Sequence, residues 1–260
     1  MKVVILAGGL GTRISEESHL RPKPMIEVAG VPILWHILKI YSAFGFNDFI
    51  ICCGYKGYMI KEYFANYYLH RSDVTFDFSD GNRMQTHSNV AEPWKVTLAD
   101  TGMDSQTGGR IKRIRRYVHE RPFLVTYGDG VGDVDMHALI EQHKKSAKTL
   151  TITAVQPKSR FGLLDIDESD ETTVRSFVEK KDESQSWINA GFMVMQPEIF
   201  GYLDNDMCIL ERQPMEKLAS EGKLGVYKHT GFWHCMDTQR DKGELERLWY
   251  EGNAPWKVWG

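Results

Sequence analysis

Cysteine is scarce in this chain, and its positions do not form a metal site or a disulfide framework. The four cysteines are Cys52, Cys53, Cys208 and Cys235, and no two of them form a Cys-x-x-Cys pair. The nine histidines contain no His-x-x-x-His or His-Glu-x-x-His pattern. Zinc sites and small secreted scaffolds depend on such patterns. The sequence therefore argues against a transition-metal enzyme and predicts reduced cysteines.

Long apolar runs, a leader segment and a strong charge bias are also missing. No apolar stretch approaches the ~20 residues of a membrane span, and the N-terminus leads directly into a strand pattern. Lys and Arg number 32 against 35 Asp and Glu, which gives a net charge of −3. Nucleic-acid surfaces usually carry a much stronger basic bias. We therefore expect a cytoplasmic protein without a membrane or nucleic-acid partner.

Buried strand patterns alternate with helical patterns in the first seventy residues. Apolar runs at 3–7 and 49–53 predict strands covered on both faces, and the apolar spacing at 33–44 and 56–67 predicts helices. This alternation is typical of a parallel α/β sheet. Further strands are predicted at 94–100, 122–127 and 224–227 and, as an extended sheet, at 149–155, 163–167, 173–179 and 188–195, with helices at 109–118, 136–143, 215–220 and 239–250. No linker or repeat interrupts the chain, so we expect a single domain over 1–260.

A glycine-rich segment follows the first predicted strand. Residues 3–13 read Val-Val-Ile-Leu-Ala-Gly-Gly-Leu-Gly-Thr-Arg, and Pro-Lys-Pro-Met follows at 22–25. Glycines at 8, 9 and 11 let the backbone turn its N–H groups toward phosphate oxygens and approach them closely. A dinucleotide fingerprint would need glycine where Ile14 stands, and a Walker A loop would end in Gly-Lys-Ser/Thr. Both familiar phosphate loops are therefore excluded.

The glycine loop and the downstream lysine motif together resemble the signature of the sugar-1-phosphate nucleotidylyltransferases. The resemblance implies a Rossmann-like α/β fold in which 1–148 bind the nucleotide and 149–260 the sugar. It also implies an in-line displacement at the α-phosphate that needs no general base, because the attacking sugar phosphate is already ionised. The alternative is a tight strand-to-helix turn with surface Arg and Lys. The joint occurrence of both motifs in the expected order argues against it.

The resemblance assigns two catalytic cations and a nucleotide-binding set. Arg13 is expected on the triphosphate near the departing pyrophosphate, and Lys23 on the α-phosphate and the incoming phosphate. Prolines on both sides hold the backbone of Lys23 extended. The nucleotide-binding set comprises Leu6, Ala7, Gly8, Gly9, Gly11, Thr12, Arg13, Lys23, Ser105, Arg110 and Gly128.

Two aspartates far apart in the sequence match the magnesium ligands of that family. Asp129 follows a predicted buried strand and Gly128, and Asp237 is the aspartate of a Trp-x-x-x-Asp-Thr match at 233–238. Alone, each would read as a turn residue or a helix cap. The resemblance makes them a pair that holds Mg²⁺, which prefers carboxylate oxygens and substrate phosphates.

The residues expected to bind the sugar 1-phosphate include a Glu-Lys motif that follows another predicted strand. Glu179 and Lys180 resemble a Glu-Lys-Pro motif in which the glutamate accepts from sugar hydroxyls and the lysine holds the phosphate. Lys181 stands where that motif has proline. The sugar-phosphate set is Gly162, Glu179, Lys180, Asn189 and Gly191. For the residues of this set at 160–162 and 189–192, the alternative to sugar binding is a structural role, as a turn and a strand bulge respectively.

Segment 100–110 and several others resemble the branch of that family that uses CTP and glucose 1-phosphate. The resemblance implies CDP-glucose as product and nucleotide-sugar biosynthesis for O-antigen lipopolysaccharide. Separately, we expect a homo-oligomer, for which the aromatics at 59–71 and 256–259 are candidate interface residues. Departures from the branch are Arg21, Lys181 and Cys235. The alternatives are a uridylyl- or thymidylyltransferase, a cytidylyltransferase for another sugar 1-phosphate, and a silent nucleotide-binding regulatory subunit. The complete set of charged site residues favours an active enzyme.

Overall fold

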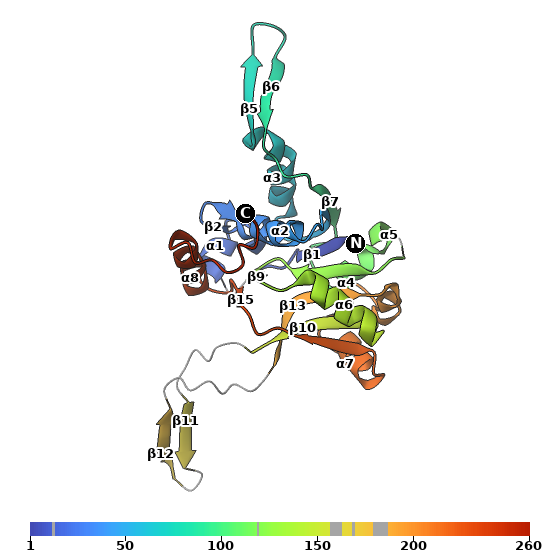
Figure 1. Cartoon of the computed structure of the whole chain (residues 1–260), viewed down its shortest axis with the longest axis vertical. Coiled ribbons are helices and arrows are strands. Elements are labelled where there is room, and N and C mark those ends of the chain that lie inside the picture. The colour runs from blue at the N-terminus through green and yellow to red at the C-terminus, as the bar shows by residue number, and fades with distance from the viewer. Residues whose placement is uncertain (12–13, 119, 157–162, 168–169, 179–186) are drawn as a thin grey trace.

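A seven-stranded sheet forms the centre of the molecule (Figure 1). The computed structural model describes residues 1–11, 14–118, 120–156, 163–167, 170–178 and 187–260. The strand order is β14-β10-β13-β8-β1-β4-β7. The strands are β1 Val3–Ala7, β4 Asp48–Cys53, β7 Lys95–Asp100, β8 Phe123–Tyr127, β10 Leu150–Val155, β13 Ile188–Met195 and β14 Leu224–Lys228.

The sheet is mostly parallel, as the βαβ pattern predicts. β1 pairs in parallel with β4 and β8, β4 with β7, and β10 with β14. Within this sheet β13 runs antiparallel to both of its neighbours, β8 and β10. Because β1, β4 and β8 are parallel, their carboxyl ends meet at one edge, where open α/β sheets bind ligands.

Side chains alternate between two apolar cores, one on each face of the sheet. Val3 and Ile5 of β1 belong to one core, whereas Val4 and Leu6 belong to the other, as the period of two in a strand requires. Apolar side chains of α2, α6 and α8 build the first core, and those of α4, η3 and α7 the second. The central strands are therefore covered on both faces.

The helices begin and end close to the predicted bounds. They are α1 Ser15–Ser18, α2 Ile33–Ala43, α3 Gly57–His70, α4 Thr107–Arg113, α5 Arg115–Val118, α6 Met136–Ser146, α7 Gln213–Ser220 and α8 Gln239–Tyr250, with 3-10 turns η2 Lys23–Met25 and η3 Pro197–Tyr202. Asp135 caps α6 by accepting from the backbone N–H groups of His137 and Ala138 at 2.9 and 3.0 Å. The predicted helix at 109–118 is wrong as one element, because it is split into α4 and α5.

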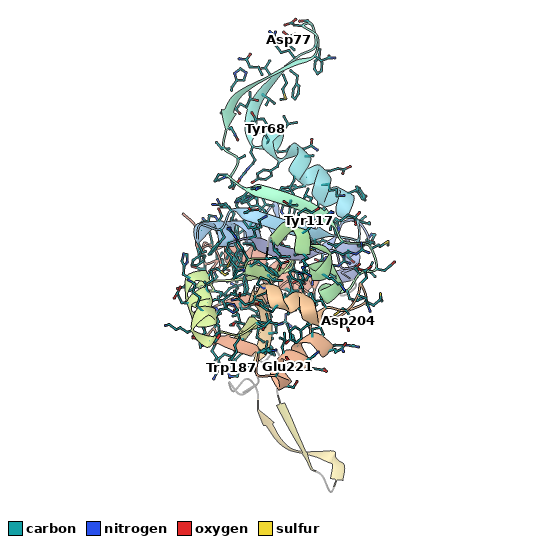
Figure 2. All side chains as sticks on the ribbon, turned by 90° about the vertical axis from the view of Figure 1, so that its right-hand side faces the viewer. Tyr68, Asp77, Tyr117, Trp187, Asp204 and Glu221 are labelled. Atoms are coloured by element: carbon teal, nitrogen blue, oxygen red, sulfur yellow. The ribbon has the colours of Figure 1, made fainter. Side chains whose placement is uncertain are left out.

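Two hairpins project from opposite ends of the body (Figure 1). One consists of β5 Ser72–Asp77 and β6 Arg83–Asn89, and Figure 2 shows Asp77 at its outer end, beyond Tyr68 of α3. The other consists of β11 Leu163–Asp167 and β12 Asp170–Val178, which pair with each other in a separate two-stranded sheet. The strands expected at 163–167 and 173–179 thus form, but not as part of the extended sheet. Position 179 lies outside the described residues.

The last residues of the chain fold back into the first core. Trp256 is fully buried and lies beside His36 of α2, toward which its indole N–H points at 3.4 Å. Phe232 stacks on Trp256 at 5.6 Å between ring centroids. The expectation that aromatics at 256–259 cover a subunit interface is therefore wrong for Trp256, because its ring is buried in the core of its own chain.

Candidate active site

The glycine loop begins where β1 ends, and a buried arginine lies beneath it. The carbonyl oxygen of Gly8 accepts from the backbone N–H of Tyr55 at 3.0 Å and from Nη2 of Arg110 at 2.8 Å. A Cβ at Gly8 would lie 2.1 Å from Nη1 of Arg110. A side chain at position 8 would therefore displace the guanidinium from these hydrogen bonds.

Arg110 ties this loop to segment 100–103, which precedes α4. Its guanidinium also donates to the carbonyl oxygens of Gly102 and Met103 and to Oγ1 of Thr101. Burial lowers the pKa of Arg110 below its usual value. Arg110 therefore holds the glycine loop against this segment, and its contact with a nucleotide stays a prediction. Ser105, two residues after this segment, is also buried.

Gly128 lies at the crossing of β1, β8 and the lysine motif. Its N–H donates to the carbonyl of Leu6 at 3.0 Å. A Cβ at Gly128 would approach that carbonyl oxygen to 2.9 Å and Cγ of Pro24 to 2.8 Å. This close packing of backbones sets Lys23, next to Pro24, beside Asp129, next to Gly128.

Lys23 lies between the two predicted metal ligands. Its Nζ atom donates to Oδ2 of Asp129 and to Oδ1 of Asp237, each at 2.6 Å. Burial alone would lower the pKa of Lys23, but the charges and hydrogen bonds of the two aspartates outweigh it and raise this pKa. The structure thus brings together three predicted site residues from distant parts of the sequence.

A small sheet explains why Asp129 and Asp237 meet. β9 Gly130–Gly132 pairs antiparallel with β15 Trp233–Cys235, so that Gly130 lies opposite Cys235. The backbone N–H of Met236 also donates to the carbonyl of Asp129 at 2.8 Å. The two strands therefore hold the aspartates, one just before β9 and one just after β15, at the same edge.

Asp237 is not the cap of the last helix. The N-cap of α8 is Thr238, which forms a capping box with Asp241, whereas the carboxylate of Asp237 faces Lys23. The Cys235 thiol donates to Oδ2 of Asp237 at 3.5 Å. Burial and the neighbouring aspartates raise the pKa of Cys235 to about 12, so its thiol is protonated at neutral pH.

The donor set at this edge fits a hard divalent cation. Two carboxylates already converge on one positive charge, and Mg²⁺ is usually bound by one or two carboxylates plus substrate phosphates and water. The described residues contain no cluster of three or more His, Cys, Asp or Glu side chains suited to a metal. Binding of Mg²⁺ by Asp129 and Asp237 stays a prediction that the donor chemistry supports.

The sugar side is described only in part. Oδ1 of Asn189 accepts from the backbone N–H of Gly191 at 2.9 Å, and Gly191 has φ +85°. The pairing of β13 with β10 shifts in register between Met193 and Asn189, so the bulge that is the alternative interpretation of this segment is present. The other predicted residues at this side, and two of the loop, lie outside the described residues: Gly162, Glu179, Lys180, Thr12 and Arg13.

Sequence reasoning missed Tyr127, Glu211 and Thr107, whose side chains are hydrogen-bonded beside the candidate site. A signal existed for Tyr127, because it directly precedes Gly128 and Asp129. Glu211 lies in a segment without any motif, so nothing in the sequence marked it.

A cavity of about 370 Å³ lies beside the glycine loop. Residues of the β4–α3 turn and of segment 100–103 line it, including Gly54, Tyr55, Asp100 and Met103. The cavity is next to the loop because Tyr55 donates to Gly8. No helix in the described ranges is long and apolar enough to span a bilayer.

The comparisons with known proteins agree with this geometry. The chain is 56% identical to glucose-1-phosphate cytidylyltransferase from Salmonella typhi and 41% identical to a probable glucose-1-phosphate cytidylyltransferase from Bacillus subtilis, in both cases over 260 residues and the full length of each protein. The structure of HddC from Yersinia pseudotuberculosis complexed with GMP-PN is 25% identical, covers 95% of this chain and 99% of its own, and gives a TM-score of 0.68. The nucleotidyl transferase family model matches residues 2–237. The chain therefore belongs to the nucleotidyl transferase family and, within it, to the glucose-1-phosphate cytidylyltransferases.

Proposed function

We propose that this enzyme transfers a cytidylyl group from CTP to α-D-glucose 1-phosphate, giving CDP-glucose and pyrophosphate. The observation that carries the proposal is the meeting of Lys23, Asp129 and Asp237 beside the glycine loop. One buried cation and two carboxylates at the ends of β1 and β8 suit the joining of two polyanions. The choice of CTP and glucose 1-phosphate follows the names of the relatives that are 56% and 41% identical.

The reaction needs charge neutralisation and alignment rather than a base. A phosphate oxygen of glucose 1-phosphate attacks the α-phosphorus of CTP, a P–O bond forms there, and the bond to the bridging oxygen of pyrophosphate breaks. Backbone N–H groups of Gly8, Gly9 and Gly11 donate to the triphosphate. Lys23 lies between the α-phosphate and the attacking phosphate, where negative charge accumulates. Arg13 is assigned to the departing pyrophosphate from its place in the motif.

Asp129 and Asp237 are proposed to hold one Mg²⁺. When bound, this ion supplies positive charge to the phosphate oxygens of the nucleotide. The protein holds the two carboxylates in place through the β9–β15 pairing and the hydrogen bond between the backbones of Met236 and Asp129.

The sugar 1-phosphate is proposed to lie between the start of β13 and the segment that contains Glu179 and Lys180. Glu179 accepts from sugar hydroxyls, and Lys180 binds the phosphate. Asn189, Gly191 and Gly162 are assigned to the same pocket from their places in the sequence. Among these, Asn189 and Gly191 have described contacts.

We further propose that the enzyme is a cytoplasmic homo-oligomer and that it supplies CDP-glucose for O-antigen lipopolysaccharide. Exposed aromatic side chains on α3 favour an interface there, because Tyr58 and Tyr68 are 59% and 41% exposed.

The test is pyrophosphate release across a grid of CTP, UTP, dTTP and GTP with the 1-phosphates of glucose, galactose and mannose. We expect CTP with glucose 1-phosphate to give the highest kcat/KM. A preference for UTP or dTTP would replace the nucleotide assignment, and a preference for another sugar would replace the sugar assignment. A silent regulatory subunit would bind CTP but release no pyrophosphate with any pair.

A further inference from the structure

A chain of hydrogen bonds links three elements beside the candidate active site. Thr107 at the start of α4 donates through Oγ1 to Oε2 of Glu211 at 2.6 Å. The hydroxyl of Tyr127, the last residue of β8, donates to Oε1 of the same carboxylate. The side-chain amide of Asn189 lies 3.4 Å from that hydroxyl. The contacts therefore run from the proposed nucleotide side to the proposed sugar side.

The direction of each hydrogen bond fixes the orientation of the Asn189 amide. The backbone N–H of Gly191 can only donate, so the amide atom that faces it at 2.9 Å is the oxygen. The amide nitrogen consequently faces Tyr127. The phenolic hydroxyl of Tyr127 carries one proton at neutral pH. That hydroxyl gives its proton to Glu211, so toward Asn189 it acts as acceptor.

The ring of Tyr127 is held in place by the bulge at Gly191. A Cβ at position 191 would lie 2.3 Å from Cδ2 of Tyr127, and Gly191 has φ +85°. Only glycine adopts this backbone readily and leaves room for the ring. The ring therefore packs directly on the backbone that carries Asn189.

Glu211 is held from the other side by the start of α4. The backbone N–H of Leu210 donates to Oγ1 of Thr107 at 2.9 Å, while that hydroxyl donates to Glu211. The backbone N–H of Gly109 also donates to the carbonyl of Cys208 at 3.1 Å. The segment that contains Glu211 is thus fixed to the helix that carries Arg110.

We infer that Tyr127 and Glu211 are positioning residues that hold the Asn189 amide with one N–H directed at a hydroxyl oxygen of the sugar in glucose 1-phosphate. This inference rests on the proposed function. Among described residues, the amide nitrogen of Asn189 donates to Tyr127 alone, which leaves its second hydrogen for a ligand. A fixed donor selects for a sugar oxygen at one position, whereas a freely rotating amide would offer either a donor or an acceptor.

The experiment measures KM and kcat for both substrates in Tyr127→Phe and Glu211→Leu. Each variant is expected to raise KM for glucose 1-phosphate by roughly three- to tenfold, the scale of one neutral hydrogen bond. KM for CTP should stay within about twofold, since the lost contact lies on the sugar side. Glu211→Gln should restore most of the affinity, because the amide oxygen of glutamine still accepts from Tyr127.

Two comparisons separate positioning from a general loss of structure. Tyr202→Phe removes another tyrosine-to-glutamate hydrogen bond, from Tyr202 to Glu221 at 2.6 Å, and should leave both KM values unchanged. In an Asn189→Ala background, Tyr127→Phe should not raise KM for glucose 1-phosphate further, because the amide that Tyr127 positions is already absent. Additive effects of the two substitutions on KM would overturn the inference.

Deoxy analogues test the same point with the wild-type side chains in place. With 2-, 3-, 4- and 6-deoxyglucose 1-phosphate, the difference between wild type and Tyr127→Phe should disappear for one analogue, the one that lacks the recognised oxygen. An equal difference for all four analogues would overturn the inference while leaving the proposed function intact. Failure of the wild-type enzyme to use glucose 1-phosphate would instead reject the proposed function.

Discussion

The Nζ atom of Lys23 lies 2.6 Å from a carboxylate oxygen of Asp237, a residue 214 positions further along the chain, and equally close to an oxygen of Asp129. One ammonium thus compensates two carboxylates that the fold brings to the same edge of the sheet. An ion of higher charge that binds these carboxylates must compete with it.

Replacement of Lys23 tests its catalytic role. Lys23→Met should lower turnover by roughly a hundredfold or more, the scale of one electrostatic transition-state contact. Lys23→Arg should not restore it fully, because a planar guanidinium cannot replace a compact ammonium between two phosphates. Lys144→Met on the outer face of α6, where the lysine pairs with Glu141 at 2.7 Å, is the control. Near-normal turnover in Lys23→Met, measured as pyrophosphate release, would contradict the assignment.

The same variant makes a prediction about metal binding without nucleotide. Lys23→Met should bind free Mn²⁺ roughly tenfold more tightly than wild type, because charges about 4 Å apart interact by about 1–4 kcal/mol between water and a partly buried site. Asp129→Asn and Asp237→Asn should bind it more weakly than wild type. Electron paramagnetic resonance of free Mn²⁺ measures these affinities. Unchanged or weaker binding by Lys23→Met would show that Lys23 does not compete with the ion.

The central sheet could be predicted from the sequence because its strands are buried on both faces. The apolar runs at 3–7 and 49–53 leave little choice of structure, and both correspond to observed strands. The hairpin β5–β6 was not predicted, because it contains no buried apolar run and most of its side chains are exposed, although Val74, Phe76 and Phe78 alternate with polar residues. Pairing of β11 with β12 rather than with the main sheet is a tertiary preference, which strand propensity does not encode.

The candidate site was predictable where a motif marks it. Lys23 and Asp129 stand in short patterns directly after or near buried strands, and the structure brings them together. From the sequence alone, Asp237 could equally have been a helix cap. The β9–β15 pairing instead brings it to the edge where Asp129 lies. Glu211 reaches the site only because its segment is fixed to α4, which is a long-range contact without a local pattern.

Two neighbouring glycines of the loop should respond differently to alanine. A Cβ at Gly8 would lie 2.1 Å from Arg110, whereas a Cβ at Gly9 meets nothing within 4 Å. Gly8→Ala should destabilise the fold by about 1–3 kcal/mol, as overpacking does, and lower Tm by about 2–10 °C for a chain of this size. Gly9→Ala should leave Tm nearly unchanged. Equal Tm values for the two variants in thermal unfolding would contradict the conclusion that close packing of Arg110 against Gly8 stabilises the loop.

The pH dependence of stability should report the burial of His36. Burial lowers the pKa of His36 from 6.5 to about 4, against a smaller opposing effect of its hydrogen bond to the carbonyl of Val28. Between these values the unfolded chain binds a proton that the folded chain does not, so the free energy of unfolding falls as pH drops from 6.5 toward 4. The loss from this residue approaches about 3 kcal/mol, since one pKa unit corresponds to about 1.4 kcal/mol.

Urea unfolding at pH 7 and at pH 4.5 measures this dependence. His36→Gln keeps an N–H for the Val28 carbonyl but does not titrate, so its free energy of unfolding should change less between the two pH values than that of wild type. Some dependence should remain, because burial also lowers the pKa of His143. His87→Gln, at an exposed position of β6, should retain the wild-type difference in free energy of unfolding between the two pH values. If His36→Gln retained it as well, the buried imidazole beside Trp256 would not be a source of acid sensitivity.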